Sequence, residues 1–161
     1  MKTYAGIGSR ETPPAVLAAM TRIAVQLSTA GYTLRSGGAV GADSAFEAGA
    51  YLKEIYLPWP RFNDNESPLH TVRTDALTIA ARLHPAWSRL GPYAQALHGR
   101  NTYQVLGEDC KTKSDFVICW TKGGKGQGGT GQAIRVARSY GVPVYDLAVW
   151  SETALLARLL P

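Results

Sequence analysis

Short apolar stretches alternate along the chain with segments that show helical periodicity. Apolar residues recur every three or four positions from Val16 to Leu27, which predicts an amphipathic helix. Stretches rich in aliphatic, β-branched and aromatic residues predict strands at 4–7, 32–36, 54–57, 116–120 and 141–146. Helices are expected around 45–50, at 68–83, at 88–106 and at 131–140, and a short one follows Ser151.

This order of elements predicts the fold class. Strands that alternate with helices are typical of βαβ units, whose right-handed crossovers build a mainly parallel sheet sandwiched by helices. The 116–120 stretch is apolar throughout, as expected for a strand that is covered on both faces. We therefore expect a single α/β domain over residues 1–161, in which residues 61–107 form a helical insertion.

Composition excludes several classes of protein. With 45% hydrophobic and 18% charged residues, the chain has the balance of a globular protein and not of a disordered one. No apolar run approaches the roughly 18 residues of a membrane helix, and the first residues lack the apolar core of a signal peptide. Cys110 and Cys119 are too few for a disulfide scaffold. We expect a cytoplasmic protein without a membrane partner.

The charge balance favours an anionic partner. Seventeen Lys and Arg residues against twelve Asp and Glu give a net charge of +5, and eleven of the seventeen are Arg. The planar guanidinium of Arg suits phosphate because it can donate two parallel hydrogen bonds. The excess is too modest to indicate nucleic acid by itself.

Glycine-rich turns follow three of the predicted strands, at residues 6–10, 36–43 and 123–131, and each precedes a helix. In an open α/β sheet, ligands bind outside the carboxyl ends of the strands. Glycine lets the backbone approach a ligand closely, and helix N-termini offer free N–H groups. The three turns predict a shared basin for phosphate or ribose. The alternative is that they are only tight turns that require glycine.

Common nucleotide and metal motifs are absent or incomplete. Glu11 stands where a dinucleotide-binding loop has its third glycine, and the G-x-G-x-x-G match at 124–129 lies late in the chain. The chain contains no phosphate-loop G-x-x-x-x-G-K-[ST] and no G-x-S-x-G elbow. His70, His84 and His98 recur every fourteen residues without zinc-site spacing, so we interpret them as surface or helix-end residues. We predict no metal and no cofactor.

Three segments together resemble one protein superfamily. Residues 36–50, which begin Ser-Gly-Gly-Ala-Val-Gly-Ala-Asp, resemble the second-strand motif of the SLOG superfamily. Residues 6–10 are similar to its first-strand loop, and residues 128–133 to its late glycine motif. The superfamily includes the DNA-processing protein DprA/Smf, the LOG phosphoribohydrolases, molybdenum-cofactor carrier proteins and YspA-like proteins. This compact chain is most similar to phage- and prophage-encoded DprA-like proteins.

The resemblance implies a Rossmann-like fold, a nucleotide or nucleotide-derived ligand, and a homodimer or higher homo-oligomer. It also implies the cytoplasm of a bacterium or of a phage-infected host cell. One departure concerns catalysis. LOG enzymes carry a catalytic Glu one helical turn after the late glycine motif, where this chain has Gln132, Ala133, Ile134 and Arg135. The resemblance therefore does not carry LOG-type hydrolysis over to this chain.

Polar residues near the three turns are the candidates for ligand binding. Arg10 is placed to clamp a phosphate, and Thr130 is placed either to contact the ligand or to cap a helix. Arg100, Asn101 and Gln104 form a polar set on one predicted helix, where the alternative is a solvated face. The predicted ligand-binding set comprises Gly8, Ser9, Arg10, Ser36, Gly37, Gly38, Gly41, Ala42, Asp43, Arg100, Asn101, Gln104, Gly128, Gly129, Thr130 and Gln132.

Two carboxylates are the candidates for catalysis. Asp43 and Glu47 lie one helical turn apart, and such a pair can perform acid–base chemistry if burial raises one pKa. The alternatives are that Asp43 is a helix N-cap and that both carboxylates are exposed near a positive helix end. Trp59, between two prolines, is a candidate for stacking on a base, with packing as the alternative.

Three functions are compatible with this pattern. The first is binding of a nucleotide or nucleotide-derived phosphate by a sensor, carrier or sequestering protein. The second is hydrolysis of a nucleotide N-glycosidic bond, with Asp43 or Glu47 in place of the missing acid. The third is DprA-like binding of single-stranded DNA along Arg73, Arg82, Arg89 and Arg100.

Overall fold

The computed structural model describes residues 1–161, in which five short strands lie side by side in one sheet. The strands are β1 (Lys2–Gly6), β2 (Tyr32–Ser36), β3 (Lys53–Ile55), β4 (Phe116–Cys119) and β5 (Val144–Asp146). The helices are α1 (Pro14–Thr29), α2 (Ala42–Gly49), α3 (Thr74–Leu83), α4 (Pro92–Leu106), α5 (Gly129–Ser139) and α6 (Glu152–Leu159). Short 3-10 turns occupy Phe62–Asp64, Trp87–Arg89 and Lys122–Gly124.

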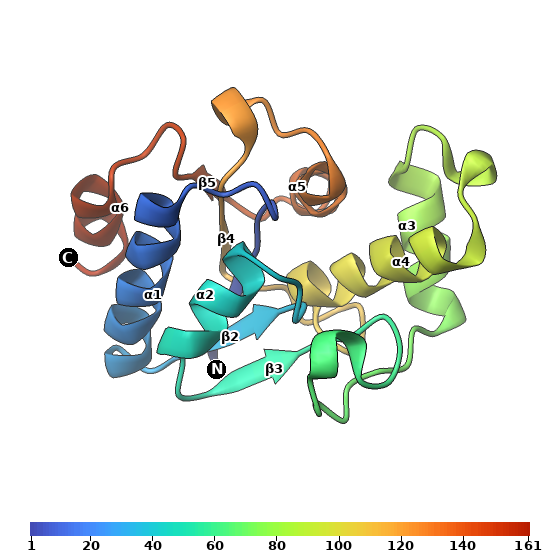
Figure 1. The fold of residues 1–161 in the computed structure, drawn as a ribbon, viewed down its shortest axis with the longest axis horizontal. Coiled ribbons are helices and arrows are strands. Elements are labelled where there is room, and N and C mark those ends of the chain that lie inside the picture. Colours follow the sequence, from blue (N-terminus) through green and yellow to red (C-terminus); the bar gives the residue numbers. More distant parts are fainter.

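All strand pairs are parallel, and the sheet order is β3-β2-β1-β4-β5. The order reverses direction at β1, so the loops after β1, β2 and β4 leave neighbouring strands at the same edge. This confirms the predicted single-domain α/β fold of Rossmann-like type, with a sheet that is parallel throughout (Figure 1). In such a sheet this reversal is where ligands bind.

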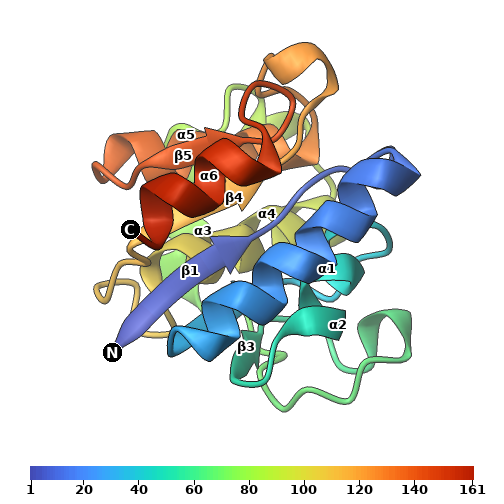
Figure 2. The same cartoon turned by 90° about the vertical axis from the view of Figure 1, so that its left-hand side faces the viewer.

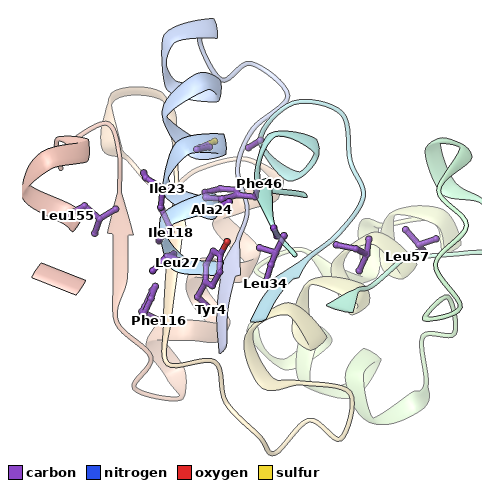
Figure 3. Packing of buried hydrophobic residues seen from close by; sticks show 14 residues of the cluster. Tyr4, Ile23, Ala24, Leu27, Leu34, Phe46, Leu57, Phe116, Ile118 and Leu155 are labelled. Atoms are coloured by element: carbon purple, nitrogen blue, oxygen red, sulfur yellow. The ribbon is translucent and has the colours of Figure 1, made fainter. Parts of the chain in front are cut away.

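Alternate residues of each strand separate the two sheet faces. Tyr4, Leu34 and Ile118 face the side covered by α1, α2 and α6, where they pack with Phe46 and Leu155 (Figure 3). Tyr4 stacks on the ring of Phe116 at 5.9 Å and contacts Phe46 edge-on. Figure 2 shows α1, α2 and α6 together on this side of β1.

The opposite face is covered by α4 and α5. Ala5 and Val117 point to this side and pack with Val105 and Leu106 of α4 and with the apolar face of α5. Helix α3 lies outside α4 and contributes Ala76 to a smaller cluster with Tyr56 and Tyr103. Because both faces are covered, every residue of β4 is buried, as its apolar sequence predicts.

Two predicted helices begin later than expected. Helix α3 starts at Thr74 and not at residue 68, because Asn65 and Ser67 use their side chains in local hydrogen bonds that compete with a helix. Helix α4 starts at Pro92 after a 3-10 turn, with proline at the first helical position, where its missing N–H costs nothing. None of the helices is both long enough and apolar enough to cross a membrane.

The contact between α1 and α2 depends on a residue without a side chain. A Cβ on Gly49 would collide with the carbonyl oxygen of Thr21 and lie 2.9 Å from the Cβ of Ala24. We expect Gly49→Ala to lower the free energy of unfolding by about 1–3 kcal/mol, although alanine is the better helix former. Urea denaturation measures the loss. Gly91→Ala, where a Cβ meets nothing within 4 Å, is the control. Equal loss in both variants would show that packing is not the cause.

Candidate functional site

The three glycine-rich loops converge at the carboxyl edge of the sheet. A Cβ on Gly8 would lie 2.6 Å from the Cβ of Ala42 and 3.4 Å from the main-chain nitrogen of Trp120. Gly8 of the first loop is therefore wedged between the start of α2 and the end of β4. A Cβ on Gly41 would lie 3.1 Å from the Cα of Arg10, so the first two loops also touch through their main chains.

Arg100 joins the middle of α4 to this edge. Its side chain is buried, and its Nη1 donates to the carbonyl oxygen of Gly37 and, at 3.3 Å, to that of Tyr56. Its Nε donates to Asn101 Oδ1 at 3.0 Å, whereas its Nη2 donates to no acceptor in the chain. Burial lowers the pKa of the guanidinium, and the charge of Asp43 opposes that shift. The helix thus presents one free amino group of a buried cation.

The second loop can lie against this cation only because residue 37 is glycine. A Cβ there would lie 2.5 Å from Arg100 Nη1 and 2.7 Å from Gln104 Nε2. Arg100 and Gln104, predicted from sequence as one polar set, thus face the same loop. Asn101 extends the connection to the third loop, because its Nδ2 donates to the carbonyl oxygen of Gly129 at 3.3 Å.

The N-terminus of α5 is open. Gly128 and Gly129 are exposed, and the main-chain N–H groups of Gly129 and Thr130 have no acceptor in the chain. The N-cap residue is Gly128, so Thr130 is a buried residue of the first turn and not a cap. Arg10 is also exposed and makes no hydrogen bond through its side chain. Free N–H groups at a helix start are a common binding place for anions.

Asp43 is a buried carboxyl in the first turn of α2. Gly41 occupies the N-cap position, which rules out the N-cap role for Asp43. Its Oδ2 accepts from the main-chain N–H of Ala39 at 3.3 Å. Burial raises the pKa of Asp43 to about 6, and the positive charge of Arg100 limits the rise. No carboxylate oxygen lies within 4 Å of the Arg100 guanidinium, so the two groups attract each other without forming an ion pair.

Glu47 lies one turn further along α2 and faces a different space. Its carboxylate accepts from Asn65 Nδ2 at 3.1 Å and lies 3.7 Å from Lys53 Nζ. With Gly38, Ser44 and residues 63–66, it lines an open hollow of about 580 Å³. This hollow lies beside the junction of the three loops. Of the loop residues, only Gly38 and Val40 of the second loop line it. The negative charge of Glu47 contributes weakly to the raised pKa of Asp43.

Three predicted site residues are engaged within the protein. Ser36 donates its hydroxyl to the carbonyl oxygen of Gly6 at 2.6 Å, which ties β2 to β1. Ser9 Oγ accepts from the N–H of Glu11 at 2.9 Å. The side-chain amide of Gln132 donates to the carbonyl oxygen of Ala80 and accepts from Arg135, so it ties α5 to α3.

Two histidines meet in space although their sequence spacing suggests no site. His84 is the C-cap residue of α3 and His98 lies in α4, and their ring centroids are 4.7 Å apart. His98 Nδ1 is buried without a partner. Burial, together with the smaller effects of His84, Arg135 and Arg100, lowers the pKa of His98 to about 4. No set of three or more metal-ligating side chains occurs in the structure.

Comparison with known proteins identifies fold neighbours. No family model matches the chain, and no curated protein matches it. DNA processing protein A from Helicobacter pylori, described for its single-stranded DNA binding mode, has a TM-score of 0.62 and 19% identity. The match covers 98% of this chain and 72% of that chain. A protein designated TM1055 has a TM-score of 0.53 and 20% identity over 89% of this chain and 72% of that chain. At this identity these neighbours show the fold alone.

The buried carboxyl makes a testable contribution to pH-dependent stability. Between pH 3.8 and about 6 the folded state holds a proton on Asp43 that the unfolded chain has released, so this group lowers stability as pH rises. Relative to wild type, Asp43→Asn should therefore gain about 2 kcal/mol of unfolding free energy between about pH 4.5 and about pH 7.5.

Wild type must be compared with the variant at each pH, because His98 titrates in an overlapping pH range and changes the stability in the opposite direction. Its lowered pKa makes the fold more stable as pH rises. Denaturant unfolding of wild type and Asp43→Asn at both pH values isolates the carboxyl, with the exposed Glu11→Gln as control. A wild-type-minus-variant difference that is the same at both pH values would show that Asp43 is not a buried, destabilised carboxylate.

Proposed function

We propose that the protein binds a nucleotide or nucleotide-derived phosphate ligand at the carboxyl edge of its sheet, as a sensor, carrier or sequestering protein. The observation that carries this proposal is the convergence of three glycine-rich loops beside the free Nη2 of Arg100 and the open N-terminus of α5. These groups are hydrogen-bond donors and carry full or partial positive charge. They therefore suit an anion with several oxygen atoms.

Each donor has a distinct role in this proposal. The N–H groups of Gly129 and Thr130 hold the phosphate, and the exposed side chain of Arg10 closes over it. Arg100 keeps the second loop in place through Gly37 and offers Nη2 to the ligand. Asp43 supplies an acceptor for a sugar hydroxyl. The fold shared with DNA processing protein A supports a nucleotide-related ligand in general terms. A homodimer or higher homo-oligomer, in a bacterial or phage-infected cell, stays a prediction of the family resemblance.

The proposal predicts that Arg10 contributes to affinity without supporting the fold. Arg10→Ala should weaken binding about 10-fold or more, because a charge-assisted hydrogen bond is worth about 1.5–3 kcal/mol. Isothermal titration with AMP, ADP-ribose and cyclic AMP measures the loss. Arg158→Ala, which removes the same charge from the exposed last turn of α6, should bind like wild type. Binding of none of these ligands at micromolar concentration would contradict the proposed function.

A second candidate function is hydrolysis of a nucleotide N-glycosidic bond. The observation that favours it is the pKa of Asp43, which burial raises to about 6, close to the value that suits an acid–base catalyst near neutral pH. Asp43 is the carboxyl next to the three loops, whereas Glu47 faces the neighbouring hollow. This assigns the proton transfer to Asp43 and not to Glu47.

The hydrolase candidate predicts release of free base from nucleoside monophosphates. Asp43→Asn should reduce the rate at least 100-fold, the usual contribution of general acid–base catalysis. Glu47→Gln should keep most of it. Chromatographic detection of the base measures both. Nucleotide binding without base release in wild type would reject hydrolysis and keep the binding function.

Of the four arginines predicted as a track for single-stranded DNA, Arg73, Arg82 and Arg89 are exposed and Arg100 is buried. Arg82 donates to the Tyr140 hydroxyl at 3.0 Å, and Arg73 lies over the ring of Tyr103. Arg89 alone of the four is exposed without such a partner. A DNA strand on the α3–α4 surface would therefore contact three arginines and not Arg100.

A further inference from the structure

Two aromatic rings form an open corner beyond the carboxyl edge of the sheet. Trp59 follows β3 and Tyr93 lies in the first turn of α4. Their ring centroids are 5.5 Å apart and their planes cross at 76°. Tyr93 is 77% exposed, and Trp59 is only partly buried. We call this pair the aromatic corner.

A continuous row of rings links the aromatic corner to the buried cation. Trp59 contacts the ring of Phe62 edge-on at 5.3 Å, and the Arg100 guanidinium lies 5.5 Å from the centre of the Phe62 ring. Tyr93 precedes Arg100 by seven residues on α4, which corresponds to about 10 Å along the helix. The corner thus stands within reach of a ligand whose anionic end lies near Arg100.

The segment that carries Trp59 is fixed to the second glycine-rich loop. Pro58 and Pro60 flank Trp59 and restrict its backbone. Asn63 Nδ2 donates to the carbonyl oxygen of Gly38 at 3.1 Å, which anchors the segment after Trp59. The indole is therefore positioned before any ligand arrives.

Core packing does not account for the Tyr93 ring. A residue that is 77% exposed buries too little surface to stabilise the fold appreciably. Tyr51 is exposed to the same degree, at 75%, but no aromatic ring contacts it. Tyr93 differs because it is paired with Trp59, whose other aromatic neighbour, Phe62, lies against the Arg100 guanidinium. Exposed aromatic faces beside positive charge are the usual platforms for stacking nucleobases.

We propose that the aromatic corner is the nucleobase subsite of the phosphate site described above, on whose existence it depends. The base stacks on the exposed face of Tyr93 and meets Trp59 at an angle, while the phosphate lies near Arg100 and the start of α5. Stacking recognises the flat face of a base and not its hydrogen-bonding edge. The ligand class is therefore a nucleotide with an unpaired base, either free or within a single strand.

The test compares ligands with and without a base. AMP, ribose 5-phosphate and a short oligothymidylate are titrated into wild type, Tyr93→Ala, Tyr93→Phe and Tyr51→Ala. Tyr93→Ala should bind AMP or the oligonucleotide about 5- to 150-fold more weakly, the range found when stacking aromatics are replaced by alanine. Ribose 5-phosphate should bind all four proteins equally. Tyr93→Phe should restore affinity, and Tyr51→Ala should match wild type.

Each result supports or overturns the assignment of the aromatic corner as a nucleobase subsite. Loss for AMP assigns the corner to a free nucleotide, and loss for the oligonucleotide alone assigns it to a single strand. Unchanged affinity of Tyr93→Ala for both overturns the base subsite and leaves phosphate binding intact. Parallel loss of ribose 5-phosphate also overturns it, because Tyr93 would then shape the phosphate site. Wild type that binds none of the three ligands overturns the proposed function itself.

Discussion

The burial of one guanidinium against main-chain carbonyl oxygens organises the functional edge of this protein. Arg100 donates to Gly37 and Tyr56, which follow adjacent strands, and to Asn101, which reaches the third loop. A buried cation is costly unless its hydrogen bonds are satisfied. The carbonyl groups that satisfy it belong to the segments that would hold a ligand, so fold and site depend on the same contact.

This contact also explains the chemistry of Asp43. The carboxyl is buried near the cation but not paired with it, so burial dominates and its pKa rises. Direct pairing would have held the pKa down and made Asp43 a structural anion. Because Arg100 and Asp43 do not bond to each other, Arg100 Nη2 can donate to a ligand and the Asp43 carboxyl can accept from it. This arrangement suits a polar ligand placed between the two side chains.

Much of the fold follows from local sequence. The apolar stretch at 116–120 gives the buried β4, and the glycine-rich turns after β1, β2 and β4 lie at one edge because the sheet is parallel. The tertiary roles of single polar residues do not follow. Helical periodicity gives Arg100 and Gln132 no sign of burial. Arg100 becomes buried only when α4 packs against the segments that follow β2 and β3, and Gln132 only when α5 packs on α3. His84 and His98 also meet only through tertiary packing, because their spacing in the sequence does not determine how α3 and α4 pack.

The most direct test of the central claim is a two-dimensional amide spectrum of the ¹⁵N-labelled protein during titration with a nucleoside monophosphate. The account predicts that the largest shifts belong to the loop amides at 8–10, 37–43 and 128–130, and that these segments shift together. Shifts confined to other surfaces, or to only one of the three loops, would contradict a shared site at the carboxyl edge.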